Sequence, residues 1–139
     1  MADNSVLTVS IVTPDGKVYE CETATLVVVR TMSGQLGIMP NHIPVIASLE
    51  VDEAKVKHDG NEDEIAVNGG FVEFSDNNLT IIADSAEKQG DIDVDRATNA
   101  QHRAEEHLKE ARQKHDDQDI LRTQVALKRA INRIHVAKR

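Results

Sequence analysis

The chain has 139 residues and a net charge of −8, which suits one domain or a small domain with an appendage and argues against a sequence-independent nucleic-acid binder. Aromatic residues make up only 2% of the chain, so Val, Ile, Leu and Ala must form the core. No apolar run approaches the roughly 18–20 residues of a membrane span, no secretory signal is visible, and the single cysteine, Cys21, favours a reducing compartment.

In the first part of the chain, glycine and proline are distributed as in a β domain. All seven Gly and all three Pro lie at or before Gly90. β-rich runs alternate there with turn signals, a pattern that is typical of a sandwich or barrel. The expected strands cover 6–12, 17–22, 25–30, 43–49, 50–58, 64–67, 71–74 and 79–83. The expected turns cover 13–16, 59–61, 68–70 and 75–78, and the Gly-rich segment 33–37 is also interpreted as a turn.

The second part is predicted to form two helices separated by a polar break near 114–118. Small or apolar residues recur there at spacings of three and four, which is typical of one helix face. They are Ala97, Ala100, Ala104, Leu108 and Ala111, then Ile120, Thr123, Leu127, Ala130, Ile131 and Ile134. Aspartates at 91, 93 and 95, and at 116, 117 and 119, supply caps and a favourable first turn. An alanine seam buries little area, so we expect a marginal hairpin that docks or detaches with a partner or ligand.

The same two parts of the chain also differ in their content of charged residues. Residues 1–90 carry five Lys/Arg against fifteen Asp/Glu, whereas residues 91–139 carry eleven against nine. This asymmetry suggests different partners for the two parts, although an acidic domain with a mixed-charge helical tail is the plainer explanation.

No catalytic signature is present. The chain lacks a phosphate-binding loop, a dinucleotide fingerprint and a nucleophile elbow, and its helical histidines lack the i, i+4 spacing of a zinc pair. We therefore expect no catalytic residues and no metal ligands.

The arginines are more informative. Arg96 and Arg103 share one helix face, and Arg122, Arg129 and Arg133 share another. They are either a phosphate site between antiparallel helices or a solvated charged face.

Four segments carry a resemblance to a known family. These are VSIVTPDG at 9–16, GQLGIMPNHIP at 34–44, IAVNGGFVE at 65–73 and ALKRAINR at 126–133. In this order they closely resemble the epsilon subunit of bacterial F-type ATP synthase. The resemblance implies a ten-stranded β-sandwich over 1–86 and an antiparallel two-helix hairpin over 87–139.

The resemblance also implies a function. The chain would be a non-catalytic central-stalk subunit of a rotary proton-translocating ATP synthase, peripheral on the cytoplasmic face of the cell membrane. Its partners would be the gamma subunit, the c-ring and, with extended helices, the alpha/beta catalytic head, where the helices inhibit ATP hydrolysis. Gln35 and His42 resemble the c-ring contact, and Gln35 stands where the family often has an acidic residue.

A further resemblance concerns nucleotide. The segment IDVDRA at 92–97 is similar to a motif of epsilon subunits that bind ATP with the helices folded down. It implies ATP as a regulatory ligand rather than a required cofactor. The residues that the resemblance assigns to ATP are Glu87, Ile92, Asp93, Arg96, Ala97, Arg103, Arg129 and Arg133.

Two other readings of the chain stay open. The same arginines would serve a stand-alone ATP-binding sensor or adaptor, which would exist as a lone monomer rather than within a large ATPase. An unrecognised hydrolase is the third hypothesis, and the missing nucleophile–base pattern argues against it.

Overall fold

A computed structural model describes residues 5–139, which divide into two compact units between Gln89 and Gly90. The sequence places this boundary between residues 86 and 87. Residues 86–88 instead form a last strand, β7 (Ala86–Lys88), which pairs with β5 through Ile65↔Lys88 and Val67↔Ala86. The first unit therefore ends just after this strand.

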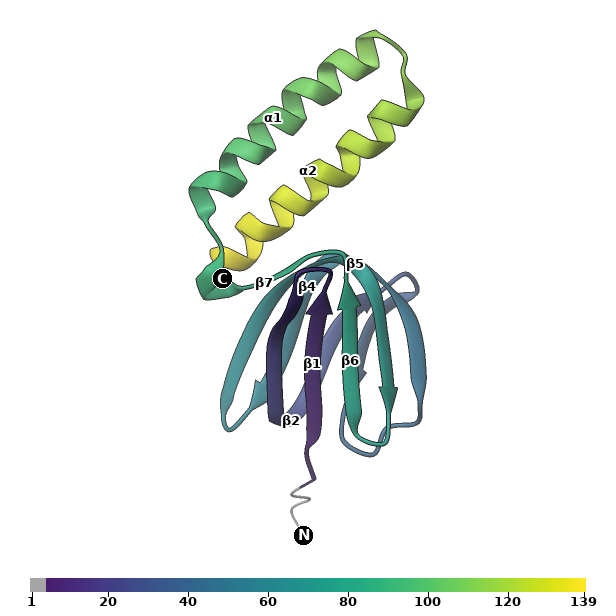
Figure 1. Ribbon diagram of the computed structural model, residues 1–139, viewed down its shortest axis with the longest axis vertical. Helices are drawn as coiled ribbons and strands as arrows, with labels where there is room; N and C mark the ends of the chain where they lie inside the picture. The colour runs from purple at the N-terminus through teal and green to yellow at the C-terminus, as the bar shows by residue number, and fades with distance from the viewer. Residues whose placement is uncertain (1–4) are drawn as a thin grey trace. The chain divides into compact units, whose positions relative to one another are not determined.

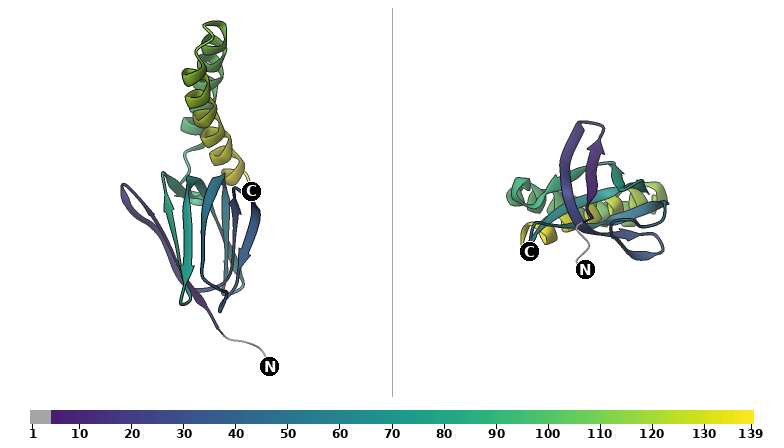
Figure 2. Two further views of the ribbon diagram at one scale, coloured as in Figure 1. Left: turned by 90° about the vertical axis from the view of Figure 1, so that its right-hand side faces the viewer. Right: turned by 90° about the horizontal axis from the view of Figure 1, so that it is seen from below.

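The first unit is a β-sandwich whose sheet closes on itself. Its strands follow the order β1-β6-β5-β4-β2-β3, and β1 pairs with β2 as well as with β6. Figures 1 and 2 show these strands in two facing layers. Besides β7, the strands are β1 (Leu7–Thr13), β2 (Gly16–Thr31), β3 (Gly34–Ile38), β4 (Val45–His58), β5 (Asn61–Ser75) and β6 (Asn78–Ala83). Closure leaves β1 hydrogen-bonded on both sides, which removes one exposed sheet edge.

The fold class is confirmed, but the strand count differs from the expected ten. Residues 5–139 contain seven strands, because three of them run without a break through segments that we expected to be separate. The segments 17–22 and 25–30 join in β2, 43–49 and 50–58 in β4, and 64–67 and 71–74 in β5. In β2, register shifts between Ala24 and Leu26 and between Val28 and Thr31 mark where the strand bends without ending.

The turn expected at 68–70 is wrong, because Asn68, Gly69 and Gly70 lie within β5. A Cβ on Gly70 would clash with the carbonyl oxygen of Ile82, so this glycine permits close strand approach. Asn68 is fully buried, and its side-chain amide donates a hydrogen bond to Ser85 Oγ at 3.0 Å. The Asn-Gly-Gly signal here therefore reports local packing and not a chain reversal.

Other turns follow the sequence. Asp59 and Gly60, with φ of 49° and 77°, join His58 to Asn61 in the β4–β5 hairpin. Two residues at positive φ give the twist that a tight hairpin needs. Asp76 and Asn77 do the same between β5 and β6. The segment 33–37 is only partly a turn, because most of it belongs to β3.

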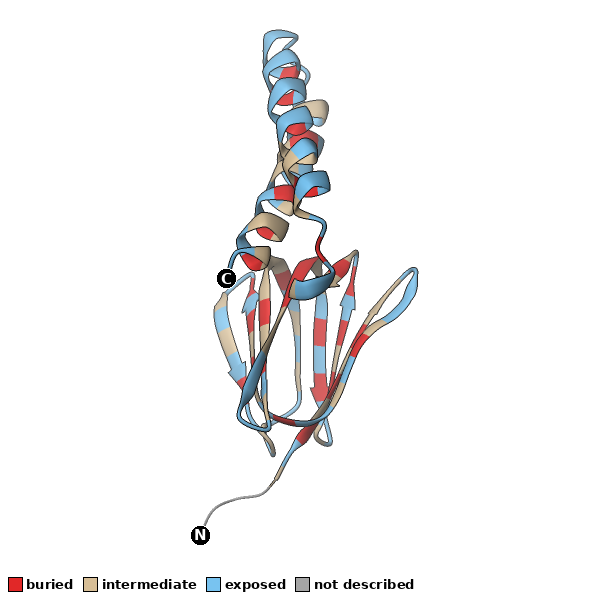
Figure 3. Ribbon diagram, turned by 90° about the vertical axis from the view of Figure 1, so that its left-hand side faces the viewer, coloured by how far each residue is buried: buried red, intermediate tan, exposed pale blue. Residues whose placement is uncertain are grey.

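Branched aliphatic side chains fill the core of the sandwich. In β1, the residues Leu7, Val9 and Ile11 are buried and alternate with partly exposed ones. Figure 3 shows this alternation of buried and exposed positions along the strands. Phe74, at 1% exposed, is the only phenylalanine in the core, in line with the aromatic-poor composition.

The second unit is a helical hairpin of α1 (Val94–Gln113) and α2 (Asp117–Ala137). A short 3₁₀ helix, η1 (Gln89–Asp91), precedes it. The side chain of Asp93 caps α1 by accepting from the Arg96 amide at 3.0 Å, and Asp116 caps α2 by accepting from Asp119 at 3.2 Å. None of the helices within residues 5–139 combines the length and apolar character that crossing a membrane requires.

The expected seam of α1 is largely confirmed. Ala97, Ala104, Leu108 and Ala111 are buried. On α2, Thr123 and Ala130 are buried as expected, but Ile131 is 47% exposed. Asn132 and Val136 are buried instead, so the buried face of α2 is rotated from the one that its most apolar residues indicate.

A polar cluster ties the β4–β5 hairpin to β2. His58 Nε2 lies 2.8 Å from Asp63 Oδ2, and its Nδ1 lies 3.2 Å from Asp59 Oδ2. Tyr19 donates to Asp63 at 2.7 Å, and Thr23 donates to Asp59 at 2.6 Å. The bonds to Asp59 and Asp63 raise the pKa of His58, and the bonds from Thr23 and His58 lower the pKa of Asp59. Burial opposes ionisation of Asp63, but the bonds from Tyr19 and His58 outweigh it and lower its pKa.

This cluster predicts a pH dependence of stability. Because folding raises the pKa of His58, its contribution is full below its ordinary pKa of 6.5 and is lost as the pH rises through the raised value. The change should not exceed about 1 kcal/mol for a partly solvated pair. Urea unfolding between about pH 6 and 8 should show a falling midpoint. A His58→Gln variant should flatten this slope, whereas His102→Gln, an exposed change on α1, should keep it. Equal slopes in all three proteins would contradict the assignment.

Candidate functional site

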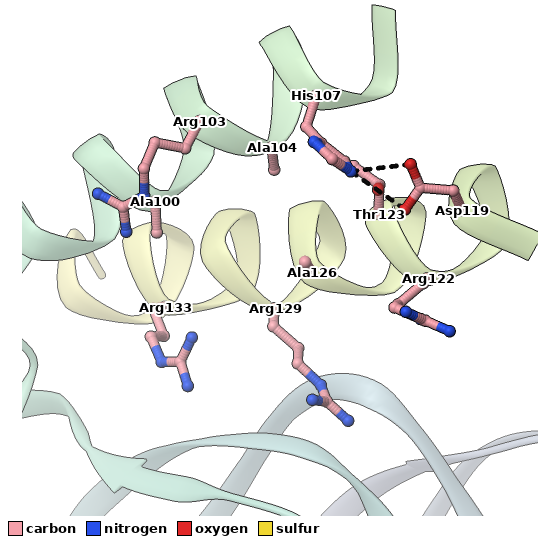
Figure 4. A pocket seen from close by; sticks show the side chains of 10 residues that line it. All are labelled: Ala100, Arg103, Ala104, His107, Asp119, Arg122, Thr123, Ala126, Arg129 and Arg133. Atoms are coloured by element: carbon pink, nitrogen blue, oxygen red, sulfur yellow. Dashed lines mark hydrogen bonds and ion pairs between the residues drawn. The ribbon is translucent and has the colours of Figure 1, made fainter. Parts of the chain in front are cut away.

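A groove runs between the two helices of the second unit and encloses about 550 Å³. Figure 4 shows it with α1 on one side and α2 on the other. Ten residues line it: Ala100, Arg103, Ala104, His107, Asp119, Arg122, Thr123, Ala126, Arg129 and Arg133. All ten belong to the same compact unit, so the groove is complete within the helical hairpin.

Small side chains make room for the groove. Ala104 and Thr123 are 7% and 5% exposed and lie deep in it, while Ala100 and Ala126 are more exposed. Any longer apolar residue at these positions would fill the space between the helices. The alanine spacing that predicted a weak seam therefore also produces an open channel.

Arginine dominates the charge of the groove. Arg103 comes from α1, and Arg122, Arg129 and Arg133 come from α2, so both predicted arginine faces reach the lining. Figure 4 shows the three α2 arginines extending to the same side of that helix. Against four guanidinium groups the lining holds one carboxylate, that of Asp119. Guanidinium forks in such a setting bind phosphate oxygens bidentately.

The remaining residues that the resemblance assigns to ATP lie outside the groove lining. Arg96 and Asp93 are at the start of α1, where Asp93 serves as its cap. Ala97 is buried in the seam and Ile92 is 9% exposed. Glu87 belongs to β7, in the first unit. Their assignment to ATP stays a prediction.

A hydrogen bond joins the two helices at the edge of the groove. His107 Nε2 lies 2.9 Å from Asp119 Oδ2 and 3.1 Å from Oδ1. The sequence analysis missed this pair, because it depends on the register in which α1 faces α2. Within residues 5–139, no three His, Cys, Asp or Glu side chains gather in a way that could hold a metal ion.

The residues expected to contact a c-ring lie in the first unit. Gln35 is exposed in β3, where it pairs with Arg30 of β2. His42 follows β3 and packs edge-on against Phe74, with ring centroids 6.0 Å apart. Met39 and Ile43, beside His42 in sequence, are 60% and 73% exposed. The structure thus holds His42 on an apolar core residue beside exposed apolar side chains.

Comparison with protein families accounts for both units. Residues 6–89 match the β-sandwich domain of the ATP synthase delta/epsilon chain, and residues 91–138 match its long α-helix domain. Together these matches cover nearly the whole chain. The chain therefore belongs to the ATP synthase delta/epsilon chain family.

Individual relatives show which member of this family the chain resembles. The chain is 66% identical to the ATP synthase epsilon chain of Levilactobacillus brevis and 61% identical to that of Pediococcus pentosaceus, over 99% of each chain. The resemblance to epsilon chains drawn from the sequence is thus confirmed, and with it a non-catalytic subunit of ATP synthase.

Solved structures share the fold. A chain in the cryo-EM structure of the Euglena gracilis mitochondrial ATP synthase, OSCP/F1/c-ring in rotational state 1, has a TM-score of 0.77 at 19% identity. The match covers 100% of this chain and 87% of that one. A chain of the Tetrahymena thermophila mitochondrial ATP synthase central stalk/c-ring has a TM-score of 0.53 at 15% identity, covering 66% and 72%.

The His107–Asp119 pair predicts a local effect on the hairpin. Both side chains are partly exposed, so His107→Ala should cost the helix pairing only about 0.5 kcal/mol. Amide exchange should then rise about twofold in the second half of α1 and the first half of α2. The control is His102→Ala, whose 3.8 Å contact with Glu105 stays within α1. Equal effects of the two variants would show that the pair does not join the helices.

Proposed function

We propose that the chain is the central-stalk subunit of a rotary proton-translocating ATP synthase on the cytoplasmic face of the bacterial cell membrane. In this role it couples rotation of the gamma subunit and c-ring to ATP synthesis and attaches to the membrane through the complex alone. The observation that carries the proposal is the match of both structural units, over the full length, to epsilon chains.

The outer face of the sandwich supports docking to partner subunits. Phe71 pairs directly with Ile82, and Ile46 lies on the same face two positions along β4 from Ser48, the partner of Phe71. These three apolar side chains are 49–78% exposed. Clustered apolar exposure on a sheet marks an interaction surface. We assign this face to the gamma subunit and the exposed segment around Gln35 and His42 to the c-ring.

The helical hairpin supports the inhibitory role. Residues 116–139 carry six Lys/Arg against three Asp, a net charge of +3, which suits an acidic surface on the alpha/beta catalytic head. Leu121, Val125 and Ile131 are 42–64% exposed on α2 and could pack against that surface. The thin alanine seam lets the hairpin leave its compact form at little cost. Extended helices would then block ATP hydrolysis.

ATP is proposed as the ligand that stabilises the compact hairpin. The groove supports this role because Arg103 reaches it from α1, and Arg129 and Arg133 reach it from α2. One triphosphate bound by both helices would cross-link them, and mass action then stabilises the compact form. The motif residues Glu87, Ile92, Asp93, Arg96 and Ala97 are assigned to the same ligand through the family resemblance.

ATP binding can be measured on the purified full-length chain by calorimetry. The wild type should bind, and Arg103→Ala should weaken binding about tenfold, because a charge-assisted contact to phosphate is lost. Lys128→Ala removes the same charge from an exposed position of α2 outside the groove and should bind like the wild type. Equal weakening by both variants would place ATP elsewhere, and no binding at about millimolar ATP would remove the sensor role.

Inhibition can be measured on the assembled enzyme. An ATP synthase reconstituted with the full chain should hydrolyse ATP more slowly than one reconstituted with a chain ending at Gln89, which keeps the sandwich and lacks the helices. ATP synthesis should be retained in both. Equal hydrolysis rates would contradict the inhibitory role. Failure of the full chain to join the complex would favour the alternative of a stand-alone ATP-binding sensor.

A further inference from the structure

The arginines of the groove extend beyond the reach of one triphosphate. Arg122 lies seven residues before Arg129 and eleven before Arg133, which corresponds to about 10 Å and about 16 Å along the helix axis. All three line the same groove, and Arg103 of α1 lines it as well. The ATP site proposed above uses Arg103, Arg129 and Arg133. Arg122 is therefore a further cation on the same wall that this site leaves unassigned.

Two of the groove's guanidinium groups, those of Arg103 and Arg122, are available to pair with an anion. Within residues 5–139, neither Arg103 nor Arg122 makes an ion pair or a side-chain hydrogen bond. Asp119, the carboxylate of the lining, lies 2.9 Å from His107 of α1 and is hydrogen-bonded to it. An anion that runs along the groove thus meets guanidinium groups at both ends and a hydrogen-bonded carboxylate at one edge.

The lining favours a linear chain of phosphates over other polyanions. Its small residues, Ala100, Ala104, Ala126 and Thr123, offer no charged group to pair with the side chains of a peptide. It contains no Phe, Tyr or Trp on which nucleic-acid bases could stack. Phosphate oxygens match the guanidinium forks in both charge and geometry.

We propose that the groove between α1 and α2 binds linear inorganic polyphosphate, and that Arg122 is the residue that extends the site beyond the triphosphate of a nucleotide. This inference rests on the proposed nucleotide groove, because Arg103, Arg129 and Arg133 hold the first phosphates in both cases. Arg122 holds the phosphates that follow. A polyphosphate chain and ATP therefore compete for one site.

Calorimetry on the full-length chain tests the proposal with a series of inorganic polyphosphates, from tripolyphosphate upward, at fixed salt and without magnesium. Affinity per chain should rise with length and level off once the chain spans from Arg133 to Arg122. Arg122→Ala should weaken the binding of the longer chains about fivefold more than the binding of tripolyphosphate. ATP should displace the longer chains from the wild type.

Two control variants separate charge from geometry. Lys128→Ala removes one positive charge from an exposed site of α2 outside the groove and should preserve the whole length series. Arg122→Lys keeps the charge but loses the fork, and should recover only part of the length dependence. If Lys128→Ala acts like Arg122→Ala, binding follows net charge alone and the proposal is wrong.

The outcomes also distinguish this inference from the ATP proposal. If ATP binds but the longer chains bind no tighter than tripolyphosphate, Arg122 adds nothing and the inference fails while the ATP site stands. If the length series depends on Arg122 and ATP does not bind, the polyphosphate site stands and the nucleotide role fails. If neither class of ligand binds, the groove is a solvated charged face and both proposals fail.

Discussion

The close packing of α1 against α2 through alanine and threonine side chains determines most properties of the helical unit. Ala104 and Thr123 are nearly buried between the helices, and Ala97, Ala111 and Ala130 continue the same seam. Each methyl group contributes only about 0.8 kcal/mol, so the seam holds the hairpin weakly. The same small side chains leave room for the groove. Weak pairing and an open channel thus have one cause.

The groove also gathers like charge. Arg129 and Arg133 lie four residues apart on α2, and both line it. Arg103 adds a third guanidinium from α1. The proposed anionic ligand would contact both helices at once. It would stabilise a hairpin that the thin apolar seam leaves near balance.

The sandwich contrasts with the hairpin in each of these respects. Its strands close through the double pairing of β1, its core is filled by branched aliphatic residues, and polar side chains join distant strands. The cluster around His58 links the β4–β5 hairpin to Tyr19 and Thr23 of β2. Such a unit suits the fixed platform that we propose for partner subunits, whereas the hairpin suits the proposed movable element. The difference in packing supports this proposed division of roles.

Local chemistry made a large part of this structure predictable from sequence. The confinement of Gly and Pro to residues 1–90 separates strands from helices, and Asp93 and Asp116 start the helices by capping their first amides. Asp59-Gly60 sets a hairpin through its positive φ angles. These features depend on neighbours in sequence, so they can be deduced without a fold. Heptad and i, i+4 spacing likewise placed the arginines on shared helix faces.

Tertiary contacts decided the rest. Gly69 and Gly70 lie within β5, and at Gly70 the backbone of β6 approaches too closely for a side chain, a fact that no local signal contains. The register of α1 against α2 decided that Arg122 joins Arg103 at one groove and that His107 meets Asp119, while Arg96 lies elsewhere. Sequence alone therefore determined which residues can act as caps, turns and cations. Only the packing of distant segments decided which of those cations meet, because that depends on how each helix is rotated and shifted against its partner.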